Sequence, residues 1–292
     1  MPWRRAIAFV AVIAACYLVA TSSDKPPKLS IETVDLGPEK VAMRAPARMP
    51  AGVVEIELRN RGDTLHDAQL FRVDGDRDSA DILAVLEAAD SSPKPRWLHP
   101  AGGVAPTRPG ETATVTQVLQ PGVYYVADTQ ERDVGGAHLV NAAKDGIARL
   151  EVHGQTDDEL PGAPASIVAR EYGFDTVGVK AGANRVAFRN AGRQLHQVVA
   201  FPIDEDVPFG EGKLDVLAKR NDTGWVPVDV PHGRATTVLE GGREQVTEMT
   251  FDPGRYLLLC FVTDRAGGGP QWSIGMTGRL DVSDSPPSGI GP

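Results

Sequence analysis

The stretch that decides the fold occurs twice in this chain. The first copy reads AGVVEIELRNRGDTLH over residues 51–66, and the second reads AGANRVAFRNAGRQLH over residues 181–196. Ala-Gly, Arg-Asn, Gly and Leu-His recur in register, 130 residues apart. Trp97 and Trp225 continue the match at nearly the same offset. The chain is therefore a tandem duplication, with a period far too long for a solenoid.

Each copy has the pattern of a strand, a turn and a return strand. Ile56 and Leu58 alternate with polar residues, which predicts a half-buried strand. The Asn-x-Gly step that follows predicts a turn, because Asn and Gly tolerate positive φ. Further strands are expected at 66–73, 112–119, 123–127 and 147–152, and at 196–203, 245–251, 255–262 and 279–282, with short helices at 78–89 and 212–219. Roughly seven short strands per copy predict an all-β chain of two tandem Greek-key β-sandwich domains, each with a short helical insertion.

Composition agrees with two folded domains. The chain has 292 residues, of which 41% are hydrophobic and 24% charged, and these fractions are ordinary for a folded soluble protein. Its 31 Gly and 23 Pro favour short strands over long helices. A formal net charge of −9 gives no overall attraction for nucleic acid or for an anionic membrane surface. Nucleic acid is therefore not an expected partner.

The N-terminus predicts export. Arg4 and Arg5 precede an apolar run over 6–20, which is short for a spanning helix, so residues 1–22 are interpreted as a signal peptide or lipoprotein signal. Cleavage, a lipid on Cys16 and an uncleaved anchor all stay open, and membrane contact is expected only through such an anchor or lipid. Each alternative places the folded part at the periplasmic or extracellular face of the envelope. The remaining chain divides into domain 1 (23–153), a linker (154–165), domain 2 (166–283) and a disordered tail (284–292).

A second motif follows later in copy two. Pro253-Gly254 precedes Tyr256-Leu257-Leu258-Leu259-Cys260. Together with the Asn-x-Gly-x-x-Leu-His turn, this resembles the cupredoxin, or blue-copper, family. The resemblance covers most of 165–282 and, more weakly, 29–152. It implies a cupredoxin-like sandwich in which His196, Cys260 and Met276 are copper ligands.

The second copy departs from the family pattern at one ligand. The second histidine is missing, and Gln271 stands at its expected position. One nitrogen and two sulfurs remain, a softer donor set that suits Cu(I) better than Cu(II). Trp272 and Phe261 are expected to pack over the site.

The first copy departs further. Asp128 stands where Cys260 is expected, His138 falls near the position of Gln271, and Ala143 falls near that of Met276. With His66, this leaves two histidines and one carboxylate, which could hold a non-blue divalent metal. The alternative interpretation is a set of hydrogen-bonded polar residues. The remaining histidines are interpreted as surface residues: His99, His153 and His232.

These observations leave functions of different classes open. The first is an exported envelope protein that binds copper in domain 2 for copper handling or one-electron transfer, with a redox or copper-transfer protein as partner. The second is a metal-free tandem β-sandwich that serves as a binding or scaffold module, with Cys260 a buried apolar thiol. The third has His66 and His138 complete the Cys260 site across the domain interface. Enzyme activity is not expected, because the chain has no His-x-His pair, Gly-x-Ser-x-Gly elbow or phosphate-binding loop.

Overall fold

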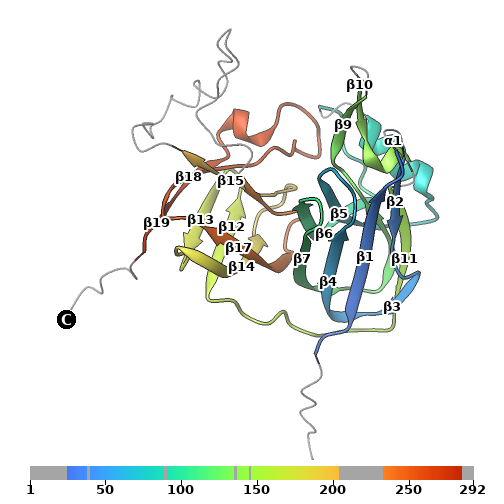
Figure 1. Cartoon of the computed structure of the whole chain (residues 1–292), viewed down its shortest axis with the longest axis horizontal. Coiled ribbons are helices and arrows are strands. Elements are labelled where there is room, and N and C mark those ends of the chain that lie inside the picture. The colour runs from blue at the N-terminus through green and yellow to red at the C-terminus, as the bar shows by residue number, and fades with distance from the viewer. Residues whose placement is uncertain are drawn as a thin grey trace, which may run out of the picture.

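The computed structural model describes residues 25–37, 40–88, 91–134, 137–144, 146–203 and 233–284 (Figure 1). Regular structure in these ranges is almost entirely β, apart from α1 (Ser79–Glu87) and short 3-10 turns. The expected signal, the helix over 212–219, His232 and nearly all of the expected tail lie outside the described residues. None of the helices in the described ranges has the length and apolarity needed to cross a membrane.

Unit 1, the β-structure over 28–153, is a two-layered sandwich. One layer has the strand order β2–β1–β4–β7, and the other has β3–β11–β8–β5–β6. The first layer contains β1 (Lys28–Asp35), β2 (Val41–Arg44), β4 (Gly52–Asn60) and β7 (Thr112–Leu119). The second contains β3 (Arg48–Pro50), β5 (His66–Val73), β6 (Leu98–Thr107), β8 (Gly122–Ala127) and β11 (Ile147–His153), and the hairpin β9 (Glu131–Val134) with β10 (Ala137–Val140) precedes β11. Alternating residues from both layers, such as Ile56, Leu70 and Tyr124, form one core.

Unit 2, the β-structure over 165–282, repeats this order. The series β13–β12–β14–β17 matches β2–β1–β4–β7, and β19–β18–β15–β16 matches β11–β8–β5–β6. Even the parallel pairing of β1 with β4 recurs between β12 and β14. The strands are β12 (Ala165–Arg170), β13 (Gly173–Val177), β14 (Gly182–Asn190), β15 (Val199–Ile203), β16 (Arg234–Ala235), β17 (Glu244–Phe251), β18 (Gly254–Leu259) and β19 (Thr277–Val282).

The two units share a sheet. β17 pairs antiparallel with β7, with Gln245 opposite Gln117 and Thr247 opposite Val115, so that one sheet of twelve strands runs through both units. Figure 1 shows β7 and β17 side by side at the junction. The side chain of Gln69 adds partly buried hydrogen bonds across this junction, because it accepts from the backbone N–H of Val238 and donates to the carbonyl of the same residue.

The predicted all-β tandem sandwich is confirmed, and the strands that the sequence predicted lie close to their expected bounds except at two ends. The other strands of the described residues were not predicted individually: β1, β2, β3, β6, β9, β10, β12, β13 and β16. β18 ends at Leu259 rather than at residue 262, because the backbone carbonyls of Cys260 and Val262 accept from a following turn instead of a strand. β15 begins at Val199 rather than at His196, which pairs instead with Leu239 in an isolated bridge.

Candidate functional site

Each repeated turn is built around its asparagine. Asn190 accepts from the N–H of Gly192 and donates to the carbonyls of Gln194 and Leu239 at 2.8 Å. Asn60 makes the same bonds in unit 1, to Gly62, Thr64 and Thr107. The motif asparagine is thus the internal support of the turn, and it places His66 and His196 in fully buried positions.

A carboxylate stands behind each histidine. Glu171 Oε1 lies 3.6 Å from His196 Nε2 and accepts from the backbone N–H groups of Arg193 and Gln194. In unit 1, Asp35 lies 3.3 Å from His66 Nε2 and accepts from the backbone of the equivalent turn. Sequence reasoning missed both carboxylates, whose signal is an acidic residue at the end of the first strand of each copy.

The glycine of the motif is explained by the same contact. A Cβ at Gly192 would lie 2.8 Å from His196 Nε2 and 2.6 Å from Glu171 Oε1. A Cβ at Gly62 would meet His66 Nε2 at 2.6 Å. Any side chain at this position would therefore separate the carboxylate from the ring. The other ring nitrogen, Nδ1, faces the position of the expected metal centre in each unit, where it contacts Asp128 in unit 1 and Gln271 in unit 2.

In unit 2, three predicted residues meet at one oxygen. His196 Nδ1 lies 2.8 Å from Gln271 Oε1, and the Cys260 thiol donates to the same oxygen at 3.0 Å. The amide nitrogen of Gln271 donates to the Leu195 carbonyl at 3.1 Å and to Asp264 Oδ1 at 2.8 Å. These two bonds fix the orientation of the amide, so its oxygen points at the imidazole and the thiol.

Met276 completes the group. It is fully buried, belongs to the same hydrophobic cluster as Cys260, and its N–H donates to the Gln271 carbonyl at 2.9 Å. Gln271 and Trp272 open a short 3-10 turn, Gln271–Ile274, that leads to Met276. Phe261 contacts Trp272, with ring centroids 6.5 Å apart, but remains 44% exposed.

Burial keeps both donor groups neutral. It raises the pKa of the Cys260 thiol to about 11, and it lowers the pKa of His196 below its usual value. At neutral pH the thiol therefore carries its proton, in agreement with its role as donor to Gln271. A metal at this centre would have to displace that proton.

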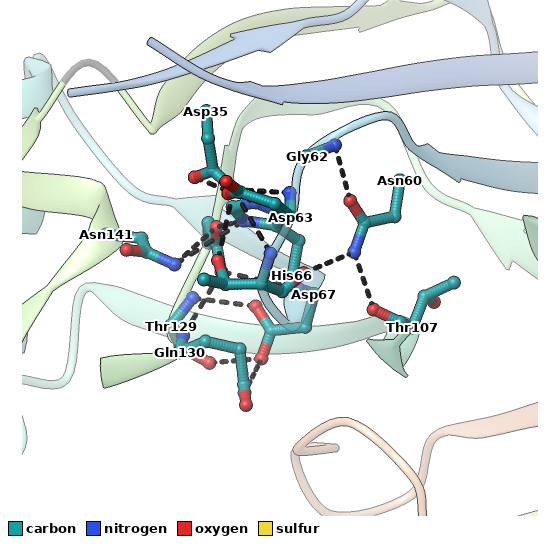
Figure 2. A network of polar contacts seen from close by, with 12 residues as sticks. Asp35, Asn60, Gly62, Asp63, His66, Asp67, Thr107, Thr129, Gln130 and Asn141 are labelled. Carbon is teal, nitrogen blue, oxygen red and sulfur yellow. Dashed lines mark hydrogen bonds and ion pairs between the residues drawn. The ribbon is translucent and has the colours of Figure 1, made fainter. Parts of the chain in front are cut away.

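Unit 1 holds a different arrangement at the equivalent place (Figure 2). His66 Nδ1 lies 2.5 Å from Asp128 Oδ2, and the Asn141 amide donates to that oxygen at 3.0 Å. Asp128 thus stands where Cys260 stands in unit 2, as the sequence predicted. Burial and the charge of Asp128 raise the pKa of the neighbouring Asp67 to about 7.

The expected alignment of the later loop in unit 1 was wrong by three residues. Asn141, not His138, occupies the position of Gln271, since each follows its histidine by 75 residues and contacts Nδ1. Consequently Gly146, rather than Ala143, corresponds to Met276. A Cβ at Gly146 would lie 2.5 Å from the Asn141 carbonyl, so this position has no room for a thioether. His138 lies on β10, and its side chain is outside the described part of the chain.

Two other expectations concern histidines outside the centres. His153 is exposed, as expected, at the end of β11. His99 was expected at the surface, and this was wrong: its side chain is only 17% exposed, and it contacts Glu240 of unit 2 and Asp74 of unit 1. Cooperation between His66 and Cys260 across the interface is not what the described residues show, because each bonds within its own unit.

Neither centre has the ligand set of a blue-copper site. No group of three or more His, Cys, Asp and Glu side chains that could hold a metal occurs among the described residues. Unit 2 has one imidazole, whereas a trigonal blue site needs two with the thiolate. Its imidazole, thiol and neighbouring thioether do match the softer donors that a monovalent copper ion accepts.

No family model matches the chain, and no curated protein does. Among solved structures, the chain is similar to copper nitrite reductase from Nitrosomonas europaea, at 14% identity over 91% of this chain and 98% of that one, with a TM-score of 0.27. Auracyanin A, a "blue" copper protein from the bacterium Chloroflexus aurantiacus, matches at 20% identity over 43% of this chain and 99% of its own, with a TM-score of 0.29. Auracyanin B matches at 26% identity over 44% of this chain and 92% of that one, with a TM-score of 0.27.

The two units share one sandwich fold, because they have the same strand order and equivalent residues meet at equivalent strand ends. In each unit the histidine after the early turn meets the residue after the late strand, β8 or β18, and an amide from the following 3-10 turn.

Proposed function

We propose that this chain is an exported cell-envelope protein whose unit 2 binds Cu(I) for copper handling. The observation that supports the proposal is the convergence of His196 Nδ1 and Cys260 Sγ on one buried oxygen, beside the buried Met276. Imidazole, thiolate and thioether are donors that suit Cu(I). These three residues would hold the ion as cargo, with the Gln271 oxygen next to it.

The surroundings of the thiol favour binding over electron transfer. Without a second imidazole, the centre lacks the donor set that serves copper in both oxidation states with little rearrangement. Because burial keeps Cys260 protonated, binding would release its proton, and affinity would rise with pH. We propose a copper-transfer protein as partner, delivery through the N-terminal export signal, and no enzymatic activity of its own.

An anaerobic Cu(I) titration against a competing chelator tests this proposal, with the full chain in a Cys16→Ser background. We expect one Cu(I) per chain in the parent protein. Cys260→Ser and His196→Ala should each weaken binding by more than the roughly 10–100-fold that follows loss of an outer-shell partner. The matched control is His66→Ala, which removes the equivalent ring of unit 1 and should leave Cu(I) affinity unchanged.

A metal-free binding or scaffold module is the second candidate, and two observations favour it. In unit 2, Gln271 bonds to both the His196 imidazole and the Cys260 thiol without an ion. In unit 1, Asp128 takes the place of the thiol and contacts the His66 imidazole. Under this alternative, Cu(I) binds no better to the parent protein than to Cys260→Ser, and copper does not raise its melting temperature, as a ligand of the native state must. A third outcome, intense visible absorption with Cu(II) that Cys260→Ser abolishes, would indicate one-electron transfer instead.

A further inference from the structure

The loop that joins Cys260 to Gln271 is anchored on unit 1. We call residues 261–270 the site loop. The Lys94 N–H donates to the Arg265 carbonyl at 2.9 Å, and the Gly268 N–H donates to the Ser91 carbonyl at 2.9 Å. Gly267 has φ +86°, and a Cβ there would lie 2.4 Å from the Ser91 carbonyl oxygen. The loop therefore follows the backbone of the segment between α1 and β6 in close contact.

A charged cluster fastens this contact. Arg265 donates to Glu240 Oε1 at 2.7 Å and, through its other terminal nitrogen, to the carbonyls of Pro95 and Leu98. His99 of unit 1 lies 3.0 Å from Glu240 and 2.8 Å from Asp74. Arg265 is only 21% exposed, so its bonds are partly shielded from water and salt. Asp74, His99, Glu240 and Arg265 form what we call the interunit cluster.

The site loop transmits this anchoring to the centre. Asp264, directly before Arg265, accepts from the Gln271 amide at 2.8 Å and from the Tyr172 hydroxyl at 2.7 Å. The Arg265 N–H donates to the side chain of Gln194, in the turn that carries His196. The Gln271 amide, which faces the thiol, is thus bonded to a residue that directly precedes the anchored Arg265.

We infer that Arg265 is a positioning residue for the unit 2 centre, and that unit 1 is required to assemble that centre. By docking the site loop on unit 1, Arg265 holds Asp264, and Asp264 holds the Gln271 oxygen toward His196 and Cys260. The importance of this arrangement for copper rests on the proposed function. The arrangement itself predicts how well the thiol is protected in the metal-free protein.

The test is the alkylation rate of Cys260 in the metal-free full chain, measured on its own peptide by mass spectrometry so that Cys16 is counted separately. Arg265→Met should raise the rate by about tenfold or more, because it removes a charge-assisted hydrogen bond and two bonds to carbonyls. Glu240→Gln, which keeps the shape of the cluster, should raise it less. Arg279→Met, which removes an exposed arginine paired with Asp281 on β19, is the matched control and should leave it unchanged.

Hydrogen exchange separates positioning from general loosening. With Arg265→Met, faster exchange should be confined to 261–276, while β14 and β17 keep the rates of the parent protein. Equal acceleration in those strands, or an unchanged alkylation rate, would overturn the inference. If the parent protein protects the thiol as expected but binds no Cu(I), the proposed function fails and the positioning role stands. If Cu(I) binds and Arg265→Met changes neither the Cu(I) affinity nor the protection of the thiol, the positioning role fails and the proposed function stands.

Discussion

At the level of single residues, the side-chain oxygen of Gln271 contacts both the imidazole and the thiol of the unit 2 centre. It accepts from Cys260 and faces His196, so it can stand beside an ion or replace one. In unit 1 the corresponding amide, Asn141, donates to Asp128 instead, because a carboxylate offers only acceptors there. The opposite orientation of the two amides thus follows from the exchange of thiol for carboxylate at the end of an equivalent strand.

Asp67 gives a pH prediction. Its pKa is about 7 in the folded protein and about 3.8 in the unfolded chain, because burial and Asp128 disfavour its charge. A group whose pKa is raised by folding stabilises the native state fully below the unfolded value, and this contribution is lost as pH rises through the folded value. Between pH 5 and pH 8, the parent protein should therefore lose on the order of a few kcal/mol more unfolding free energy than Asp67→Asn. Urea titrations at several pH values measure this, and parallel pH profiles for the two proteins would contradict it.

The sequence could identify residues whose neighbours form a motif. His196 and Cys260 follow a repeated turn and a late strand, and Gln271 followed from its place before Met276. Asp35 and Glu171 were missed because they reach their histidines from the ends of β1 and β12, which are adjacent to the turns only in three dimensions. The role of Asn141 was missed because Asp128 and Asn141 are separated by 13 residues, whereas Cys260 and Gln271 are separated by 11.

At the level of elements, α1 begins directly after Asp78, which caps its N-terminus. Asp78 accepts from the N–H groups of Ala80 and Asp81, and the Asp81 side chain accepts from the Asp78 N–H in return. Asp78→Ala should lower the free energy of unfolding by about 1 kcal/mol, because it leaves first-turn N–H groups without this acceptor. Chemical denaturation measures the change, with the exposed Asp76→Ala as control. A loss no larger than that of the control would show that the cap contributes nothing.

Two strands, β5 and β7, have the expected bounds. Burial alternates along β7, so a shift of one residue would reverse every side chain, whereas nearly every residue of β5 is buried. The end of β18 was not predictable from periodicity. Leu257, Leu258 and Leu259 continue into Cys260 without a break in hydrophobicity. The strand stops because Gln271 and Trp272, directly after the site loop, donate their N–H groups to the next carbonyls.

At the level of the whole molecule, the two units should unfold together. Gln69 donates to the carbonyls of Leu70, Gly102 and Val238 and accepts from the Val238 N–H at 2.7 Å. Gln69→Leu removes the acceptor of the Val238 N–H and a donor to the Gly102 carbonyl. A buried polar group that is left without a partner costs about 1–3 kcal/mol. Calorimetry should show one transition for the parent protein and a lower, broadened or divided transition for the variant. Gln155→Leu, at an exposed position, should match the parent, and a Gln69→Leu trace equal to that control would disprove coupling through this side chain.

The sequence duplication predicted two sandwiches, but it did not predict that they share one sheet. Nothing in the alternation of β7 or β17 distinguishes a partner within the same unit from one in the other unit. The sequence pattern gave no signal for the interunit cluster either, and His99 was therefore interpreted as a surface residue. Contacts between copies depend on how two complete surfaces fit, which a local pattern does not encode.

The pairing of β7 with β17 has a consequence for dividing the chain. Each of these strands is the edge of its own layer, and each covers the edge strand of the other unit. Gln117 lies opposite Gln245, and Val115 lies opposite Thr247. A polypeptide cut in the stretch between the sandwiches would give two fragments with bare strands, and bare strands recruit other strands. Such halves are expected to reassociate with each other when mixed, and to self-associate when each is produced alone.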